Sequence, residues 1–458
     1  MKPYINITSI IIAIWLQFSL ISCEKLLEVD TPSNQISSDQ VFENLQTANA
    51  ALAGLYSGLW DNSPIAGDQS GMLMSIYTDE LDYFASSTTN GLAELHQNNV
   101  IATNPALYTY WTNAYQKVYM ANAIIEGVEK STSLPAGEKQ RIRGEALMIR
   151  SLLFLYLQQL YGDIPYPITI DYMINQSISK TSAQEVLQRL ESDLKETILL
   201  LSDQYRHVER IYPNRKTAQL ILAKTYMLEK NWNAAEAVLK GIVQSPLYQF
   251  QNDLTKVFDK SGAHVIWQLK PRNTGDATKE IAAFYFNNSA PNTVALSPNL
   301  INSFAAADKR KQYWTSPVIV GNTTWYRPNK YKNLNNNNTE YSIVFRLEEV
   351  YLLLAETLAE QNKTNEALEL INAIKQRAGI PLLTGPQFKE MILSEISLEN
   401  RKEFFTEMGH RFLDLKRQGK LSVLTAVKPN WKIQFALLPL PQKELLLNPH
   451  LEPQNQGY

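Results

Sequence analysis

Residues 222–242, LAKTYMLEKNWNAAEAVLKGI, and residues 354–374, LAETLAEQNKTNEALELINAI, carry one pattern twice, at an offset of 132 positions. Two pairs of alanines fall in register: Ala223 with Ala355, and Ala235 with Ala367. Small side chains at such places let two helices approach closely, while bulky ones at helical spacing seal the pair. The pattern therefore predicts two helical hairpins, each with a polar turn.

The spacing of both copies is that of a tetratricopeptide repeat (TPR), and the alternative is a generic helical hairpin. Apolar residues return every three or four positions elsewhere in the chain, beginning near Asp39, which predicts further amphipathic helices. We expect TPR-like hairpins at about 110–160, 182–243 and 345–378. The fold class predicted is mainly α, a superhelix of helical hairpins.

Residues 246–342 differ in composition from the helical segments. They are rich in Asn, Pro, Ser and Thr, with short β-prone runs at 264–269 and 316–320. Residues 61–105 also lose the helical rhythm. The many aromatic residues of 246–342 argue against disorder, because disordered segments are poor in them. We expect a loop-rich, irregular lobe with short β segments at about 246–342, joined by a loop at 61–105.

The first residues are typical of an export signal. A basic start and an apolar run end in Leu20-Ile21-Ser22-Cys23, and Cys23 is the only cysteine of the 458 residues. This ending resembles a bacterial lipobox, in which the cysteine carries the lipid, and the alternative is a plain secretory signal. The sequence predicts a lipoprotein signal peptide at 1–22, a lipidated Cys23, a tether at 23–38 and a single domain at 39–458.

The composition excludes several classes of function. The chain has 43 Lys+Arg against 45 Asp+Glu and no dense basic cluster, which argues against a nucleic-acid partner. No second apolar run is long enough to cross a membrane, so contact with the membrane is expected through the lipid alone. The 5 histidines are scattered without ligand spacing, so we expect no metal site and no cofactor.

No catalytic motif is present, and we expect no enzyme activity and no catalytic residues. The carboxylate pairs that could serve a glycosidase are Asp79 with Glu80, Asp82, and Glu348 with Glu349. The last pair falls on a predicted TPR helix, where a structural role is expected. Charged residues at helical steps form a further set, predicted to be a buried or half-buried ion network: Glu403, Glu407, Arg411 and Asp414.

Residues 399–417, ENRKEFFTEMGHRFLDLKR, resemble the signature helix pair of the SusD/RagB family of Bacteroidetes outer-membrane lipoproteins. Three other blocks resemble family blocks in the same order, at 144–165, 345–356 and 438–458. The resemblance implies an α-superhelix of TPR-like hairpins that supports a loop-rich ligand face. It also implies a nutrient-binding lipoprotein at the cell surface that captures oligosaccharides, or other nutrients in some members. Its implied partner is a SusC-like TonB-dependent transporter, which it covers as a lid.

Sugar binding calls for aromatic faces against C–H groups and for polar side chains that bond to hydroxyls, on loops rather than on helix stripes. The candidate ligand-binding residues are Trp60, Tyr77, Asp79, Tyr83, Tyr285, Trp314, Trp325, Tyr326 and Arg327. For each aromatic, packing in the core is the competing interpretation. Aromatics on helix stripes are expected in the core: Trp111, Tyr115, Tyr156, Tyr226 and Trp232. Two other functions stay open, a TPR scaffold for peptide or protein cargo and a glycoside hydrolase.

Overall fold

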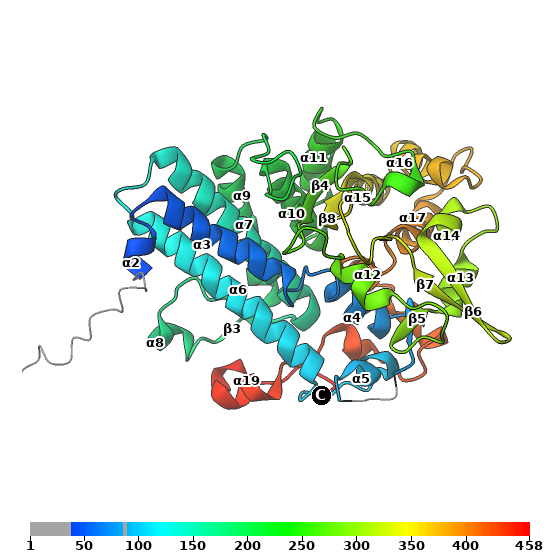
Figure 1. The fold of residues 1–458 in the computed structure, drawn as a ribbon, viewed down its shortest axis with the longest axis horizontal. Helices are drawn as coiled ribbons and strands as arrows, with labels where there is room; N and C mark the ends of the chain where they lie inside the picture. The colour runs from blue at the N-terminus through cyan, green and yellow to red at the C-terminus, as the bar shows by residue number, and fades with distance from the viewer. Residues whose placement is uncertain (1–37, 86–88) are drawn as a thin grey trace, which may run out of the picture.

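The computed structural model describes residues 38–85 and 89–458 (Figure 1). The predicted signal peptide, Cys23 and the tether up to residue 37 lie outside the described residues. Helices dominate the described chain and the strands are few and short, so the predicted mainly α fold is confirmed. Among the described residues, no helix combines the length and the apolar character that crossing a membrane requires.

The long helices pack against one another in chain order, from α6 through α7, α9, α10 and α11 to α15, α16, α17 and α18 (Figure 1). Helix α3 covers α6 and α7 from the N-terminal side. The bounds are α3 Leu45–Trp60, α6 Pro105–Lys130, α7 Ala136–Tyr161, α9 Ala183–Leu200, α10 Arg215–Leu228, α11 Trp232–Val243, α15 Leu347–Glu360, α16 Thr364–Ala378, α17 Lys389–Phe404 and α18 His410–Arg417.

The two copies of the repeated pattern form the hairpins α10–α11 and α15–α16, and their turns are the same. Lys230 and Asn362 both have left-handed backbone, with φ of 57° and 61°. The next amide closes each turn, at 2.8 Å from Asn231 N to Tyr226 O and 2.9 Å from Lys363 N to Leu358 O. Helix α11 packs directly on α15, so the hairpins are neighbours although the lobe separates them in sequence.

Local sequence sets several helix ends. Ser182 caps α9, because its Oγ accepts a hydrogen bond from Glu185 N at 3.2 Å. Helix α7 ends at Gly162, whose φ of 77° favours glycine, and Pro165 follows in strand β2. The hairpins thus begin and end where short-range chemistry favours it.

The lobe between the hairpins contains three short helices and most of the strands. Its main sheet has the strand order β1-β5-β7-β6, and a second sheet pairs β4 with β8. Outside the lobe, β2 pairs with β3. The strands are β1 Leu81–Tyr83, β2 Ile164–Pro165, β3 Lys180–Thr181, β4 Val265–Leu269, β5 Val294–Leu296, β6 Thr315–Val320, β7 Thr323–Pro328 and β8 Ser342–Arg346. The three short helices of the lobe are α12 Lys279–Phe284, α13 Pro298–Ser303 and α14 Lys309–Trp314. Short helices elsewhere in the described chain are α2 Ser38–Val41, α4 Ser70–Tyr77, α5 Leu92–Gln97, α8 Tyr172–Asn175 and α19 Gln442–Leu447. Segment 61–105, expected as a loop, therefore contains α4, β1 and α5.

A buried ion network fastens this lobe to the helices. Arg310 of the lobe and Arg346 at the end of β8 both contact Glu403 of α17, at 3.4 Å and 2.6 Å between guanidinium nitrogen and carboxylate oxygen. Lys330 of the lobe bonds to Glu407 at 2.5 Å. The prediction is confirmed for Glu403 and Glu407, which are buried in an ion network. It is wrong for the other two members, because Arg411 pairs with Asp79 and Asp414 pairs with Arg417.

Candidate functional site

The main sheet brings together the two segments that were expected to bind ligand. Strand β1 pairs with β5 through Tyr83 and Val294, and β5 meets β7 through Leu296 and Tyr326. Phe84 continues the first ladder, because its N donates to Thr293 O at 2.8 Å. Residues near 80 and near 325 therefore lie on one surface, although more than half of the chain separates them.

Side chains alternate between the two faces of a strand, and this alternation sorts the candidate residues. One face, here named the outer sheet face, carries Asp82, Phe84, Trp325 and Arg327, with Tyr285 beside it. Trp325 is half-buried against Phe286, Ala295 and Val318. The opposite face carries Tyr83 and Tyr326, which are half-buried against the main core.

The aromatic groups of the outer sheet face remain open to solvent. Phe84 is 43% exposed and Tyr285 is 38% exposed. The Arg327 guanidinium carbon lies 4.6 Å from the centre of the Tyr285 ring, which places a cation against an aromatic face. The sequence did not single out Phe84, although strand alternation next to Tyr83 is a signal that could have found it.

Arg327 is a cation with spare hydrogen-bonding capacity. Its Nη1 donates to Asn329 Oδ1 at 3.2 Å, and its Nε is buried without a hydrogen-bond partner. Burial lowers the pKa of its guanidinium, and no described carboxylate forms an ion pair with it. Such a group can donate to a hydroxyl or to another acceptor on a ligand.

A cavity of about 490 Å³ adjoins this face. Asp82 belongs to both surfaces, and it shares the cavity wall with Asp79, His96, Asn299 and Lys428. His96 Nε2 lies 3.6 Å from Asp82 Oδ1. His96, Asn299 and Lys428 are distant in sequence and follow no motif, so sequence reasoning missed them.

Asp79 is held in the cavity wall by two arginines of the family-like helix pair. Arg411 Nε donates to Asp79 Oδ1 at 2.9 Å, and Arg401 Nη2 lies 3.0 Å from Asp79 Oδ2. Burial opposes ionisation of Asp79, yet its bonds and charge contacts with Arg411 and Arg401 hold its pKa below the usual value. The candidate residue therefore orients the segment before β1 as well as facing the cavity.

Three predicted ligand-binding aromatics belong instead to the core. Trp314 is 1% exposed, and its Nε1 donates to Leu254 O at 2.9 Å. Tyr77 is buried and donates to Phe435 O, and Trp60 is buried in the main core. Their placement corrects the expectation that these aromatics face a ligand, because neighbouring elements cover them.

The carboxylates considered for glycoside hydrolysis form ion pairs and hydrogen bonds within the protein. Glu348 is buried beside Arg377, at 2.9 Å between Oε1 and Nη1. Glu349 pairs with Lys224, and Glu80 accepts from Ser75 Oγ at 2.5 Å. Within residues 38–85 and 89–458, no cluster of three or more His, Cys, Asp or Glu side chains could hold a metal ion.

Comparison with known proteins gives consistent matches. A family model described as "Starch-binding associating with outer membrane" matches residues 25–227, and a model of the SusD family matches residues 310–426. A SusD-like protein of Formosa agariphila is 25% identical over 99% of this chain and 100% of its own length. A SusD-like protein of Bacteroides ovatus is 22% identical over 68% of this chain and 65% of its own length.

Solved structures share the fold. A SusD superfamily protein of Bacteroides vulgatus superposes with a TM-score of 0.78 at 21% identity, covering 91% of this chain and 100% of the other. Surface glycan-binding protein A of Bacteroides thetaiotaomicron, in complex with laminarihexaose, gives a TM-score of 0.74 at 17% identity, covering 90% and 99%.

Proposed function

This chain belongs to the SusD family, and on that premise we propose that it captures an oligosaccharide at the cell surface and delivers it to a partner SusC-like, TonB-dependent transporter. The observation that carries the proposal is the outer sheet face, where Phe84, Tyr285 and Trp325 gather beside Arg327. The laminarihexaose complex of a protein with the same fold supports the ligand class.

The chemistry of this face suits a sugar. The apolar C–H side of a pyranose packs on aromatic rings, and removal of that surface from water favours binding. The guanidinium of Arg327 and the carboxylate of Asp82 supply donors and acceptors for hydroxyl groups. Tyr83 and Tyr326 are half-buried behind the sheet and support the strands that carry the ligand-facing residues.

The proposed function is binding without catalysis. Two catalytic carboxylates of a glycosidase must face each other across the scissile bond. Glu348 and Glu349 are instead buried in ion pairs, and Asp79 is neutralised by two arginines. Capture followed by release to a transporter requires no bond cleavage.

A lipid on Cys23 would place the protein at the outer membrane, and residues 24–37 would then form the link to the first described helix. The structure describes the chain from Ser38 onward, where α2 begins. A tethered binder stays near its transporter at a high effective concentration. The description of the matching family as associated with the outer membrane agrees with this location.

Calorimetry against a panel of oligosaccharides tests the proposal. Trp325→Ala, Phe84→Ala and Arg327→Ala should each weaken binding at least tenfold, because each removes a ring or donor from the outer sheet face. Phe388→Ala is the control, since Phe388 is an exposed aromatic at the start of α17. Unchanged affinity in all three variants would refute the assignment of the face.

A further inference from the structure

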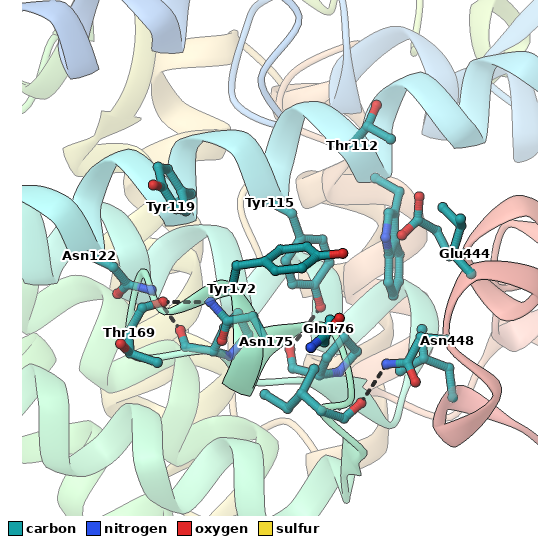
Figure 2. Close-up of a pocket in the computed structure, with 16 residues that line it drawn as sticks. Thr112, Tyr115, Tyr119, Asn122, Thr169, Tyr172, Asn175, Gln176, Glu444 and Asn448 are labelled. Carbon is teal, nitrogen blue, oxygen red and sulfur yellow. Dashed lines mark hydrogen bonds between the residues drawn. The ribbon is translucent and has the colours of Figure 1, made fainter. Parts of the chain in front are cut away.

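A second cavity, of about 460 Å³, lies between α6, the segment around α8 and the C-terminal α19 (Figure 2). It is separate from the outer sheet face, because α8 and α19 lie at the opposite end of the molecule from β6 and β7 (Figure 1). Its volume falls within the range of small-ligand pockets, about 300–1,000 Å³. None of the residues expected to bind ligand lines it.

Aromatic rings form much of its wall. Trp111 and Tyr115 of α6 pack together with ring centres 4.8 Å apart, and Tyr115 donates to Pro165 O at 2.8 Å. Tyr119 and Tyr172 stand at the rim, 52% and 72% exposed. Figure 2 shows Tyr172 reaching from α8 toward the aromatic side chains of α6. The rim rings offer a ligand apolar faces that now contact water.

The segment that forms the opposite wall is fixed in place by amide side chains. Asn122 Nδ2 donates to Pro167 O at 2.9 Å, and Asn448 Nδ2 donates to Ile178 O at 2.8 Å. Asn175 Nδ2 donates to Thr169 O at 2.8 Å within the segment itself. The cavity is therefore bounded by two long-range anchors and does not depend on a ligand to form.

Two acceptor groups in this wall lack partners. Asn175 Oδ1 is buried and accepts no hydrogen bond, and buried polar atoms without partners are uncommon. The carboxylate of Glu444 forms no hydrogen bond or ion pair with any described residue, and burial raises its pKa. The Glu444 carboxylate therefore offers acceptor oxygens to a ligand that is rich in donors.

The charge of the lining limits the class of ligand. Among the described residues, neither lysine nor arginine lines the cavity, and Glu444 is its one acidic side chain. An anionic ligand would meet a carboxylate without a balancing cation. A neutral, hydroxylated ligand such as a pyranose can stack on Tyr172 and donate to Glu444.

The geometry points to a second saccharide-binding pocket, lined by Trp111, Tyr115, Tyr172, Asn175 and Glu444, that takes one or more units of a neutral sugar. The proposal of this pocket does not depend on the outer sheet face being the primary binding site. Two separated sites on one molecule would hold a long glycan at two points, which raises overall affinity without new contacts at either site.

Titration of the full-length chain tests the pocket. The probes are laminarihexaose, cellohexaose, maltohexaose, xylohexaose and mannohexaose, followed by calorimetry in a Trp325→Ala background that disables the outer sheet face. We expect residual binding of at least one probe in this background. Adding Tyr172→Ala or Glu444→Gln should weaken that residual binding at least tenfold.

The matched control is Ile174→Ala, because Ile174 is an exposed residue of α8 that does not line the cavity. It should leave residual binding within twofold. The pocket is overturned if the Trp325→Ala chain binds no probe, or if Tyr172→Ala and Glu444→Gln leave residual binding unchanged. Tyr172-dependent binding of tetramethylammonium in place of the sugars would also overturn it. Equal binding by wild type and Trp325→Ala would instead count against the proposed function of the sheet face.

Discussion

Arg346 Nη1 lies 2.6 Å from Glu403 Oε1, with both side chains buried. Arg346 comes from the end of β8 and Glu403 from the last turn of α17, so this pair joins the lobe to the helical superhelix. Burial opposes ionisation of Glu403, but Arg377, Arg346 and Arg310 hold its pKa far below the usual value. The position of the lobe on the helices therefore depends on buried charges.

Arg346→Met should destabilise the protein by roughly 3–5 kcal/mol, because it removes a buried cation and leaves the charge of Glu403 and Glu407 only partly balanced by Arg310, Arg377 and Lys330. Urea denaturation measures the loss. Glu185→Gln is the control, since Glu185 and Arg189 form an exposed pair on α9, where little change is expected. An Arg346→Met protein as stable as wild type would show that the network does not fasten the lobe.

Trp314 and Trp325 should respond in opposite ways to truncation. Trp314→Ala should cost about 3–5 kcal/mol of stability, because it empties a fully buried site. Trp325→Ala should cost less and should chiefly weaken sugar binding, since its ring is half-buried on the outer sheet face. Thermal unfolding and calorimetry of both variants check this, and a stable Trp314→Ala protein without sugar binding would reverse the assignment.

Glu280 should make stability fall as pH rises. Burial raises the pKa of its carboxyl from 4.5 to about 7, and its Oε2 accepts from Ser342 Oγ at 2.6 Å. Below about pH 4.5 the group is neutral in both states. Between there and pH 7 the unfolded chain ionises first, so stability falls by roughly 3 kcal/mol in total.

Glu280→Gln should remove this pH-dependent loss. The stability of the variant relative to wild type should therefore rise between pH 5 and pH 8. Urea denaturation of both proteins at the two pH values measures the difference, and other titrating groups cancel in the comparison. Parallel pH profiles would show that Glu280 ionises normally in the folded protein.

Lys230→Gly should raise stability by about 0.5–1 kcal/mol, because a side chain at φ of 57° is strained and glycine is not. Lys230→Ala keeps the strain and should give no such gain. The midpoints of denaturant unfolding of the two variants test this prediction. Equal midpoints would mean that the turn carries no strain.

Short-range patterns predicted the helical framework well. The repeated hairpins were found from spacing alone, because a helix face and a tight turn depend on residues a few positions apart. The α9 cap at Ser182 and the stop of α7 at Gly162 are local for the same reason. Glu403 and Glu407 could be predicted in an ion network from their spacing, but their partners Arg310, Lys330 and Arg346 could not be matched to them from sequence.

The sequence by itself determined where the chain forms hairpins and which segments carry aromatic residues for a ligand face. Only the tertiary structure decided which aromatics remain accessible. Trp314 and Trp325 lie close together in one segment, yet the core covers the first and the outer sheet face presents the second. Trp111 and Tyr115 follow a core stripe as expected, yet they also border a cavity. The physical reason is that exposure depends on what packs opposite a side chain, and those partners are distant in sequence.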